Sequence, residues 1–399
     1  MNQYFFALGT NHTLCKIDIV NALLKKGLVF EIIEASEEIL IISTSSELAP
    51  VSLVNELGSA VKIGKIFKVY PKNESWENFS EMEKEFEGKK FGISVYQAGG
   101  KYREISEIFE KTKKIGKIKE RGRVLSTVAV DKNGLMENGF EIVICVGSKG
   151  IYIGKTLAIQ DYESYSFRDY GRPGRDVKSG MIPPKLAKIM INLAGKGKEN
   201  LFLDPFCGSG TFLQELILLG YKNIIGADIE DKAIADSQNN LDWLFENYKL
   251  KKDDLKINVF KSDAGTLSEK IPKILVDAVV TEPYLGPPEA KYLFPDQIKK
   301  EIQKLEDLYL AAFKEFRKIL KNSGRVVIVF PVFRFKARFF KLQILNTLKN
   351  LGFRQIDFIE KKVAGEELLK LQITDRGSVV FFRPGQSVSR EIFVFQKIN

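Results

Sequence analysis

The residues best suited to bind a ligand lie in a glycine-containing turn at positions 204–211, Asp-Pro-Phe-Cys-Gly-Ser-Gly-Thr. An apolar run at 201–203 precedes the turn, and an apolar segment with helical spacing follows at 211–219. Glycines let the backbone approach a ligand closely, and a helix N-terminus offers N–H groups that have no partner within the helix. An ordinary tight connection between a strand and a helix has the same glycines, so the turn alone does not decide.

Two further aspartates add to this pattern. Asp228 ends the next apolar run, roughly 20 residues after the glycines, where a carboxylate can bind ribose hydroxyls. Asp263 ends the third run, at the same predicted sheet edge, within reach of an adenine amino group. Either aspartate could instead cap a helix. Because three consecutive strand ends carry suitable groups, we predict a nucleoside-type cofactor site formed by Asp204, Pro205, Phe206, Gly208, Gly210, Asp228, Ile229, Asp263 and Ala264.

The position of Asp204 separates two possible cofactors. A dinucleotide dehydrogenase would share the glycines and the ribose-binding acid. Here an acid also ends the first strand, immediately before the turn, where it suits the amino end of S-adenosylmethionine. The string at 204–211 is similar to the cofactor motif of amino-group methyltransferases, which favours methyl transfer over hydride transfer.

A fourth apolar run, 276–280, leads into the loop Glu-Pro-Tyr-Leu-Gly-Pro-Pro at 282–288. Enzymes that methylate exocyclic base nitrogens carry an acid or amide, two prolines and an aromatic residue at this point. Such a nitrogen is a poor nucleophile because its lone pair is delocalised, and hydrogen bonds from its N–H groups draw it towards tetrahedral geometry. We predict Glu282, the Pro283 carbonyl and the Tyr284 ring as the catalytic groups. Tyr284 stands where the second proline is expected, and a capped, proline-rich loop is the alternative interpretation.

The elements that must position these residues alternate between apolar runs and amphipathic segments from about residue 165 onward. Such alternation predicts a mostly parallel, doubly wound α/β sheet. The last two runs, about 376–383 and 391–397, have no helix between them and should form an antiparallel pair at the sheet edge. We therefore predict a Rossmann-like, seven-stranded methyltransferase domain over residues 161–399.

The first 160 residues predict smaller α+β modules. Residues 1–70 show a β-α-β-β-α-β order, which is typical of a ferredoxin-like fold. Residues 71–160 combine a polar linker with strand-like runs at 91–96, 124–130, 140–146 and 151–159. Basic side chains crowd positions 101–123, where they could follow a phosphate backbone or form a solvated helix face.

Composition narrows the range of partners. The 399-residue chain has a net charge of +10 and a pI near 9.1, which favours a polyanion such as nucleic acid. One histidine and three scattered cysteines offer neither a metal site nor a disulfide framework, so we expect a reduced, cytoplasmic protein without a metal centre. No apolar run is long enough to span a membrane.

Two strings upstream of the glycine turn, RDYGRPGRD at 168–176 and GMIPPKLA at 180–187, complete a family resemblance. With the motifs at 204–211 and 282–284, they resemble the RNA guanine-N2 methyltransferases that carry an N-terminal THUMP domain. That group includes the enzymes that modify the tenth-position guanosine of tRNA. The resemblance covers about 165–395, and over 1–160 it rests on domain order alone.

The resemblance implies S-adenosylmethionine as cofactor, RNA (above all tRNA) as substrate, and a THUMP-like RNA-binding module over 71–160. Arg168, Arg172 and Arg175 precede the catalytic sheet, and we predict them as RNA contacts.

Two alternatives remain open. A DNA amino-methyltransferase acting on adenine N6 or cytosine N4 would use the same sites on a flipped base. Only the N-terminal 160 residues are left for substrate recognition, which is the layout of the RNA enzymes. A catalytically inactive RNA-binding relative is the second alternative. The target nucleotide, the choice between tRNA and rRNA, and any protein partner are not decided by the sequence.

Overall fold

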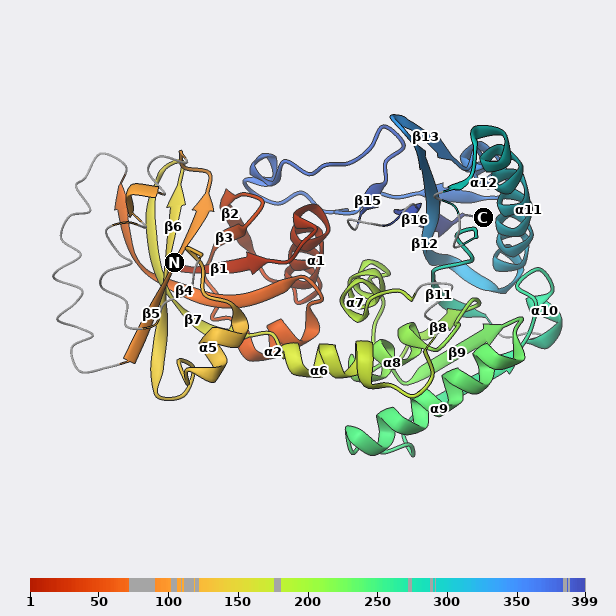
Figure 1. Ribbon diagram of the computed structural model, residues 1–399, viewed down its shortest axis with the longest axis horizontal. Helices are drawn as coiled ribbons and strands as arrows, with labels where there is room; N and C mark the ends of the chain where they lie inside the picture. The colour runs from red at the N-terminus through yellow and green to blue at the C-terminus, as the bar shows by residue number, and fades with distance from the viewer. Residues whose placement is uncertain are drawn as a thin grey trace. The chain divides into compact units, whose positions relative to one another are not determined.

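The computed structural model describes residues 1–71, 90–101, 106–108, 110, 118, 122–175, 181–271, 275–287, 290, 292–382, 386 and 388–398. The chain forms two compact units. Unit 1 comprises Met1–Ser164 with Lys361–Leu371, and unit 2 comprises Tyr165–Glu360 with Gln372–Asn399 (Figure 1). Neither unit is therefore continuous in sequence.

Unit 1 begins with the predicted ferredoxin-like order. Its elements are β1 (Asn2–Leu8), α1 (His12–Lys25), β2 (Phe30–Ala35), β3 (Ile39–Thr44), α2 (Pro50–Glu56) and β4 (Ala60–Pro71). These strands lie in the order β2-β3-β1-β4, and every neighbouring pair is antiparallel. Helix α1 begins where the Asn11 side chain accepts a hydrogen bond from the Leu14 N–H at 3.0 Å.

The same sheet continues into the rest of unit 1. The further elements are β5 (Lys90–Ala98), α5 (Thr127–Lys132), β6 (Gly139–Gly147) and β7 (Gly150–Ile159). Because β4 pairs with β7, one seven-stranded sheet runs β2-β3-β1-β4-β7-β6-β5 across both predicted modules. The strand predicted at 124–130 is wrong. Ser126 accepts a hydrogen bond from the Ala129 N–H at 3.0 Å and starts helix α5 despite the valines. The basic segment at 101–123 lies mostly outside the described residues.

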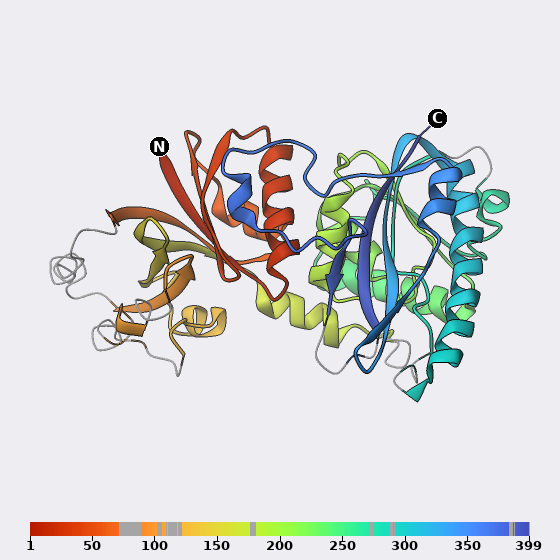
Figure 2. The same cartoon turned by 90° about the horizontal axis from the view of Figure 1, so that it is seen from above.

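Residues 361–371 cover the edge of the unit 1 sheet. The Ile32 N–H of edge strand β2 donates to the Ala364 carbonyl at 2.8 Å. The buried Lys16 ammonium of α1 donates to the Leu369 carbonyl at 2.6 Å, at the end of the short helix η4 (Glu366–Leu369). Figure 2 shows this short blue helix beside the red helix α1. We call residues 361–371 the strap.

Unit 2 contains the predicted Rossmann-like sheet. Its strands are β8 (Leu201–Asp204), β9 (Asn223–Asp228), β10 (Lys256–Lys261), β11 (Val276–Thr281), β12 (Leu320–Phe335), β13 (Arg338–Lys341), β14 (Phe353–Gln355), β15 (Val379–Phe381) and β16 (Val388–Lys397). The order is β10-β9-β8-β11-β12-β16-β14, with β13 paired to β12 and β15 to β16. The fold class is confirmed, with one correction. β16 does not lie at the edge, because β14 pairs with its other side.

Helices precede and separate these strands along the chain. They are α6 (Tyr162–Ser166), the π-helical turn η2 (Phe167–Gly171), α7 (Pro184–Leu193), α8 (Thr211–Leu218), α9 (Asp231–Asn247), α10 (Leu267–Lys270), α11 (Pro295–Ile319) and α12 (Leu345–Asn350). Within the described parts of the chain, no helix combines the length and the apolar character needed to cross a bilayer.

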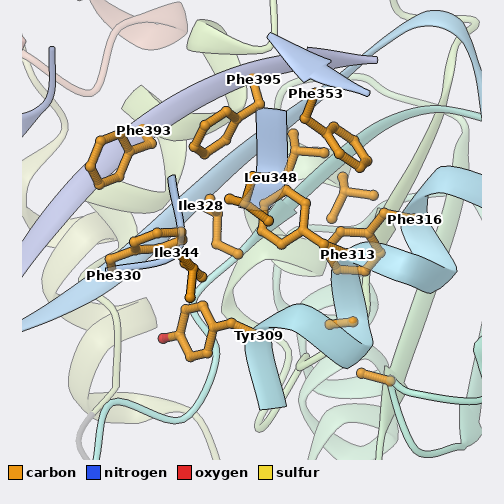
Figure 3. Close-up of a cluster of buried hydrophobic side chains, with 14 of the residues drawn as sticks. Tyr309, Phe313, Phe316, Ile328, Phe330, Ile344, Leu348, Phe353, Phe393 and Phe395 are labelled. Carbon is orange, nitrogen blue, oxygen red and sulfur yellow. The ribbon is translucent and has the colours of Figure 1, made fainter. Parts of the chain in front are cut away.

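The core of unit 2 is rich in phenylalanine. Phe313 of α11 packs edge-on against Phe353 and Phe395, with ring centroids 4.9 and 5.6 Å away (Figure 3). Burying each such ring stabilises the fold by about 1.5–3 kcal/mol. Tyr309 lies in the same cluster, and its hydroxyl bonds the Val329 carbonyl at 3.2 Å and the Tyr284 carbonyl at 3.3 Å. The core thereby holds the loop that follows β11.

Candidate active site

A cavity of about 920 Å³ opens at the carboxyl ends of β8, β9 and β11. This position is where open α/β sheets bind ligands, and the volume suits a nucleoside-sized group with room for an acceptor. Its walls contain most of the predicted residues: Asp204, Phe206, Gly208, Asp228, Ile229, Glu282, Pro283 and Tyr284, with Arg175. Three strand ends that are far apart in sequence therefore meet at one site.

The glycine turn is shaped by two left-handed residues. Gly208 has φ +51° and Gly210 has φ +81°, conformations that strain residues with a side chain. A Cβ on Gly210 would lie 2.7 Å from the Ser237 hydroxyl. The Gly208 N–H donates to Asp228 Oδ2 at 2.8 Å, and the Glu230 N–H donates to Oδ1 at 3.1 Å. Asp228 thus joins the turn to the start of α9 while its half-buried carboxylate lines the cavity.

Asp204 is a buried acid with one unused oxygen. Its Oδ1 accepts hydrogen bonds from the Thr281 hydroxyl at 2.6 Å and the Phe206 N–H at 3.2 Å. Its Oδ2 is buried and has no hydrogen-bond partner. The pKa of Asp204 is raised to about 7, mainly by burial; the hydrogen bonds from Thr281 and Phe206 lower it, and the negative charges of Asp228 and Glu282 add to the rise. A buried polar atom without a partner is costly, so this oxygen fits a cationic group of a ligand.

The acceptor loop, residues 282–287, holds its acid through an ion pair. Two guanidinium nitrogens of Arg390, on β16, donate to Glu282: Nε to Oε2 at 2.5 Å and Nη2 to Oε1 at 2.8 Å. Both side chains are largely buried, at 4% and 10% exposed. The Glu282 charge raises the pKa of Arg390 even though burial opposes this. Each carboxylate oxygen keeps a second lone pair for a further donor.

The other predicted residues lie around rather than in the cavity. Pro205 and Gly210 belong to the turn, and Gly210 caps the start of α8, but neither lines the wall. Asp263 follows β10 at the same sheet edge and accepts a hydrogen bond from the Gly265 N–H at 2.7 Å. Ala264 packs in the core cluster. A direct contact of Asp263 with adenine stays a prediction.

Two of the predicted RNA-binding arginines are buried. Arg168 is 4% exposed and binds Glu215, with Nε 2.6 Å from Oε1. Arg172 is 3% exposed and donates to the Thr211 hydroxyl at 2.7 Å, and burial lowers its pKa to about 10. Neither guanidinium is accessible to RNA, so the prediction is corrected for both. Arg175 is exposed, lines the cavity and lies 5.4 Å from the Tyr170 ring centroid.

Comparison with known proteins identifies the domain that carries this cavity. Residues 172–349 match the family model UPF0020, described as RMKL-like, methyltransferase domain. The matched residues all lie in unit 2. The match includes the glycine turn, Asp228 and the acceptor loop, and ends before Arg390.

Curated relatives and a solved structure agree with the domain match. A protein named tRNA (guanine(10)-N2)-dimethyltransferase from Methanocaldococcus jannaschii is 30% identical over 221 residues, covering 53% of this chain and 55% of the relative. A protein of the same name from Methanothermobacter thermautotrophicus is 38% identical over 109 residues, covering 27% of this chain and 28% of the relative. The chain thus spans about half the length of the first relative and less of the second. The crystal structure of TrmN from Thermus thermophilus shares the fold, with a TM-score of 0.56 and 15% identity over 99% of this chain and 100% of that one.

S-adenosylmethionine is the cofactor of the methyltransferase domain, and the residues present fit it. When bound, it supplies a methyl group on a positively charged sulfur. The unpartnered Oδ2 of Asp204 suits its ammonium group, and the Asp228 carboxylate suits ribose hydroxyls. The left-handed turn at Gly208 leaves backbone without side chains against the cavity.

Proposed function

We propose that this protein transfers a methyl group from S-adenosylmethionine to the exocyclic N2 of a guanosine in tRNA. One observation carries the choice of base: both oxygens of the loop acid Glu282, which lines the cavity, accept hydrogen bonds from the Arg390 guanidinium. The names of the two archaeal relatives, which share the domain, support the same substrate.

The chemistry of the base edge supports guanine over the other amino bases. An ionised carboxylate only accepts hydrogen bonds. Guanine presents two donors side by side, N1–H and N2–H, which match the two oxygens of Glu282. Adenine N6 and cytosine N4 each lie beside a ring nitrogen that carries a lone pair, which would face the second oxygen and be repelled. Glu282 and the Pro283 carbonyl would orient the amine towards the methyl group, and the exposed Tyr284 ring would stack on the base.

Binding of the rest of the RNA is assigned to unit 1. Residues 1–70 form the ferredoxin-like part, and residues 71–160 would serve as the THUMP-like module. The net charge of the whole chain, +10, favours a phosphate backbone as ligand. The exposed Arg175 of unit 2, at the cavity, would add a contact. A cytoplasmic location belongs to the same proposal, since the three buried cysteines form no disulfide.

The test is transfer of tritiated methyl groups to unmodified bulk tRNA, rRNA and DNA, followed by nucleoside digestion and mass spectrometry. The expected product is N2-methylguanosine in tRNA, and Glu282→Gln should lose transfer while it retains donor binding. N6-methyladenine or N4-methylcytosine in DNA would refute the substrate. Donor binding without transfer to any pool would instead indicate an inactive, RNA-binding relative.

A further inference from the structure

The hairpin formed by the end of β12 and β13, residues 333–341, has its base packed on the acceptor loop. Phe333 is buried, and a Cβ on Gly286 of the loop would lie 2.7 Å from its ring. Gly286 has φ +104°, so the loop passes this ring in a conformation that glycine permits. The hairpin therefore continues the wall of the active site beyond the cavity.

The register of the hairpin sorts its rings and cations onto two faces. Phe333 pairs with Phe340 and Phe335 with Arg338, whereas Arg334 pairs with Phe339. Residues that are directly opposite in an antiparallel pair share a face, and successive residues alternate. Phe335 and Arg338 therefore lie on the same face as Phe333, which contacts the acceptor loop, and Arg334 and Phe339 lie on the other face.

A further exposed ring extends the face towards helix α11. Phe294, at the N-terminus of α11, is 67% exposed, and its ring centroid lies 6.2 Å from that of Phe335. The Lys336 ammonium lies 5.7 Å from the Phe335 ring centroid, and Arg338 is exposed. Two rings and two cations are thus gathered towards the tip of the hairpin whose base contacts the acceptor loop. We call Phe294, Phe335, Lys336 and Arg338 the loop-side face.

We propose that the loop-side face binds the unpaired RNA nucleotides that flank the target guanosine, with bases stacked on the rings and phosphates beside Lys336 and Arg338. This inference rests on the proposed function. A base must leave its stack to reach the cavity, which leaves its neighbours unstacked. Flat apolar rings accept any base, and cations neutralise the phosphates between them. Residues 333–341 contain four basic side chains and no acidic one. Their charge therefore suits an anionic partner such as RNA rather than a basic or neutral partner.

The hairpin supplies its own matched control. The test variant is Phe294→Ala with Arg338→Glu, on the loop-side face. The control variant is Phe339→Ala with Arg334→Glu, which makes the same chemical changes on the opposite face, where Phe339 is 62% exposed. Both variants carry exposed substitutions, and calorimetric affinity for S-adenosylmethionine serves as the check that the full-length protein is folded.

The probes are a fluorescein-labelled, unstructured decanucleotide RNA containing one guanosine, and unmodified bulk tRNA. We expect the test variant to bind the decanucleotide about 10-fold more weakly, as loss of one stacked base would cause. Its salt dependence should fall by about one counterion, and the control variant should bind as the wild type does. Equal losses in both variants would reduce the effect to general surface charge and overturn the assignment, as would no loss in either.

Anisotropy measures binding without methyl transfer, so the two proposals fail separately. Wild-type protein that methylates tRNA guanosine, together with a test variant of unchanged RNA affinity, would refute only the loop-side face. A test variant that binds RNA weakly, in a protein that methylates no RNA, would refute only the proposed function.

Discussion

Asp204 should make both stability and donor binding depend on pH. The native state holds the Asp204 proton up to a pKa of about 7, whereas the ordinary value is 3.8. The unfolded chain therefore loses this proton first, and stability falls as pH rises from about 4 to 7. The difference of about 3 pKa units corresponds to a total loss of about 4 kcal/mol, complete above pH 7.

The variant Asp204→Asn removes this titration. Between pH 5 and pH 8 the wild type should lose about 3 kcal/mol of unfolding free energy relative to the variant, because only the part of the titration above pH 5 counts. The amide can still accept from Thr281, and the cost of its unpartnered NH₂ group is the same at both pH values. Urea unfolding of both proteins at the two pH values measures the difference. If the unfolding free energies of the wild type and the variant differed by the same amount at pH 5 and pH 8, the burial and charge environment assigned to Asp204 would be refuted.

Donor binding provides an independent readout of the same group. An ammonium group beside Oδ2 favours the ionised acid, so binding of S-adenosylmethionine should release about 0.9 proton at pH 6 and about 0.1 at pH 8. Titration calorimetry in two buffers of different ionisation enthalpy measures the released protons. Asp204→Asn should bind the donor more weakly and release none. Proton release by the variant equal to that of the wild type would assign the release to another group.

Three further outcomes are expected. Arg390→Met should lower the methyl-transfer kcat by about 100-fold, since misplacing a catalytic group by about 1 Å has that effect, and Arg390→Lys should restore only part because it cannot bind Glu282 with two ends; equal activity in all three proteins would contradict the positioning role. Gly210→Ala should weaken donor binding at least 10-fold in calorimetry, because φ +81° and the Ser237 hydroxyl at 2.7 Å both oppose a Cβ; unchanged affinity would contradict the turn geometry. Tyr284→Ala should raise the KM for RNA about 10-fold through lost stacking, with Tyr284→Phe near wild type; a phenylalanine variant as impaired as alanine would assign the effect to the hydroxyl.

Local spacing was enough to predict the sheet and the meeting of three strand ends at one cavity. The turn at 204–211, Asp228 and the acceptor loop each follow an apolar strand, and a parallel sheet necessarily brings such ends together. Arg390 could not be predicted, because it lies 108 positions from Glu282 and reaches it only through the pairing of β16 with β12. No nearby residue marks it as different from other basic residues in a strand.

The burial of two arginine side chains was the other feature that could not be predicted from the sequence. Arg168 and Arg172 belong to a basic string that is typical of RNA binding. Their partners are Glu215 and Thr211 of helix α8, which lie 47 and 39 positions later in the chain. Similarly, the valines at 124–130 favour a strand, but Ser126 caps the start of a helix there. In these cases a tertiary contact or a single cap outweighs the local pattern.

The strap gives the chain a particular order of assembly during synthesis. Strand β2 and helix α1 are complete within the first 35 residues, yet their partners Ala364 and Leu369 are made more than 300 residues later. Until then, the outer edge of the unit 1 sheet has unpaired backbone groups, which in other proteins recruit foreign strands. The ribosome must therefore complete most of the catalytic unit before the first domain is closed, and a fragment cut after residue 164 would never reach that closed state.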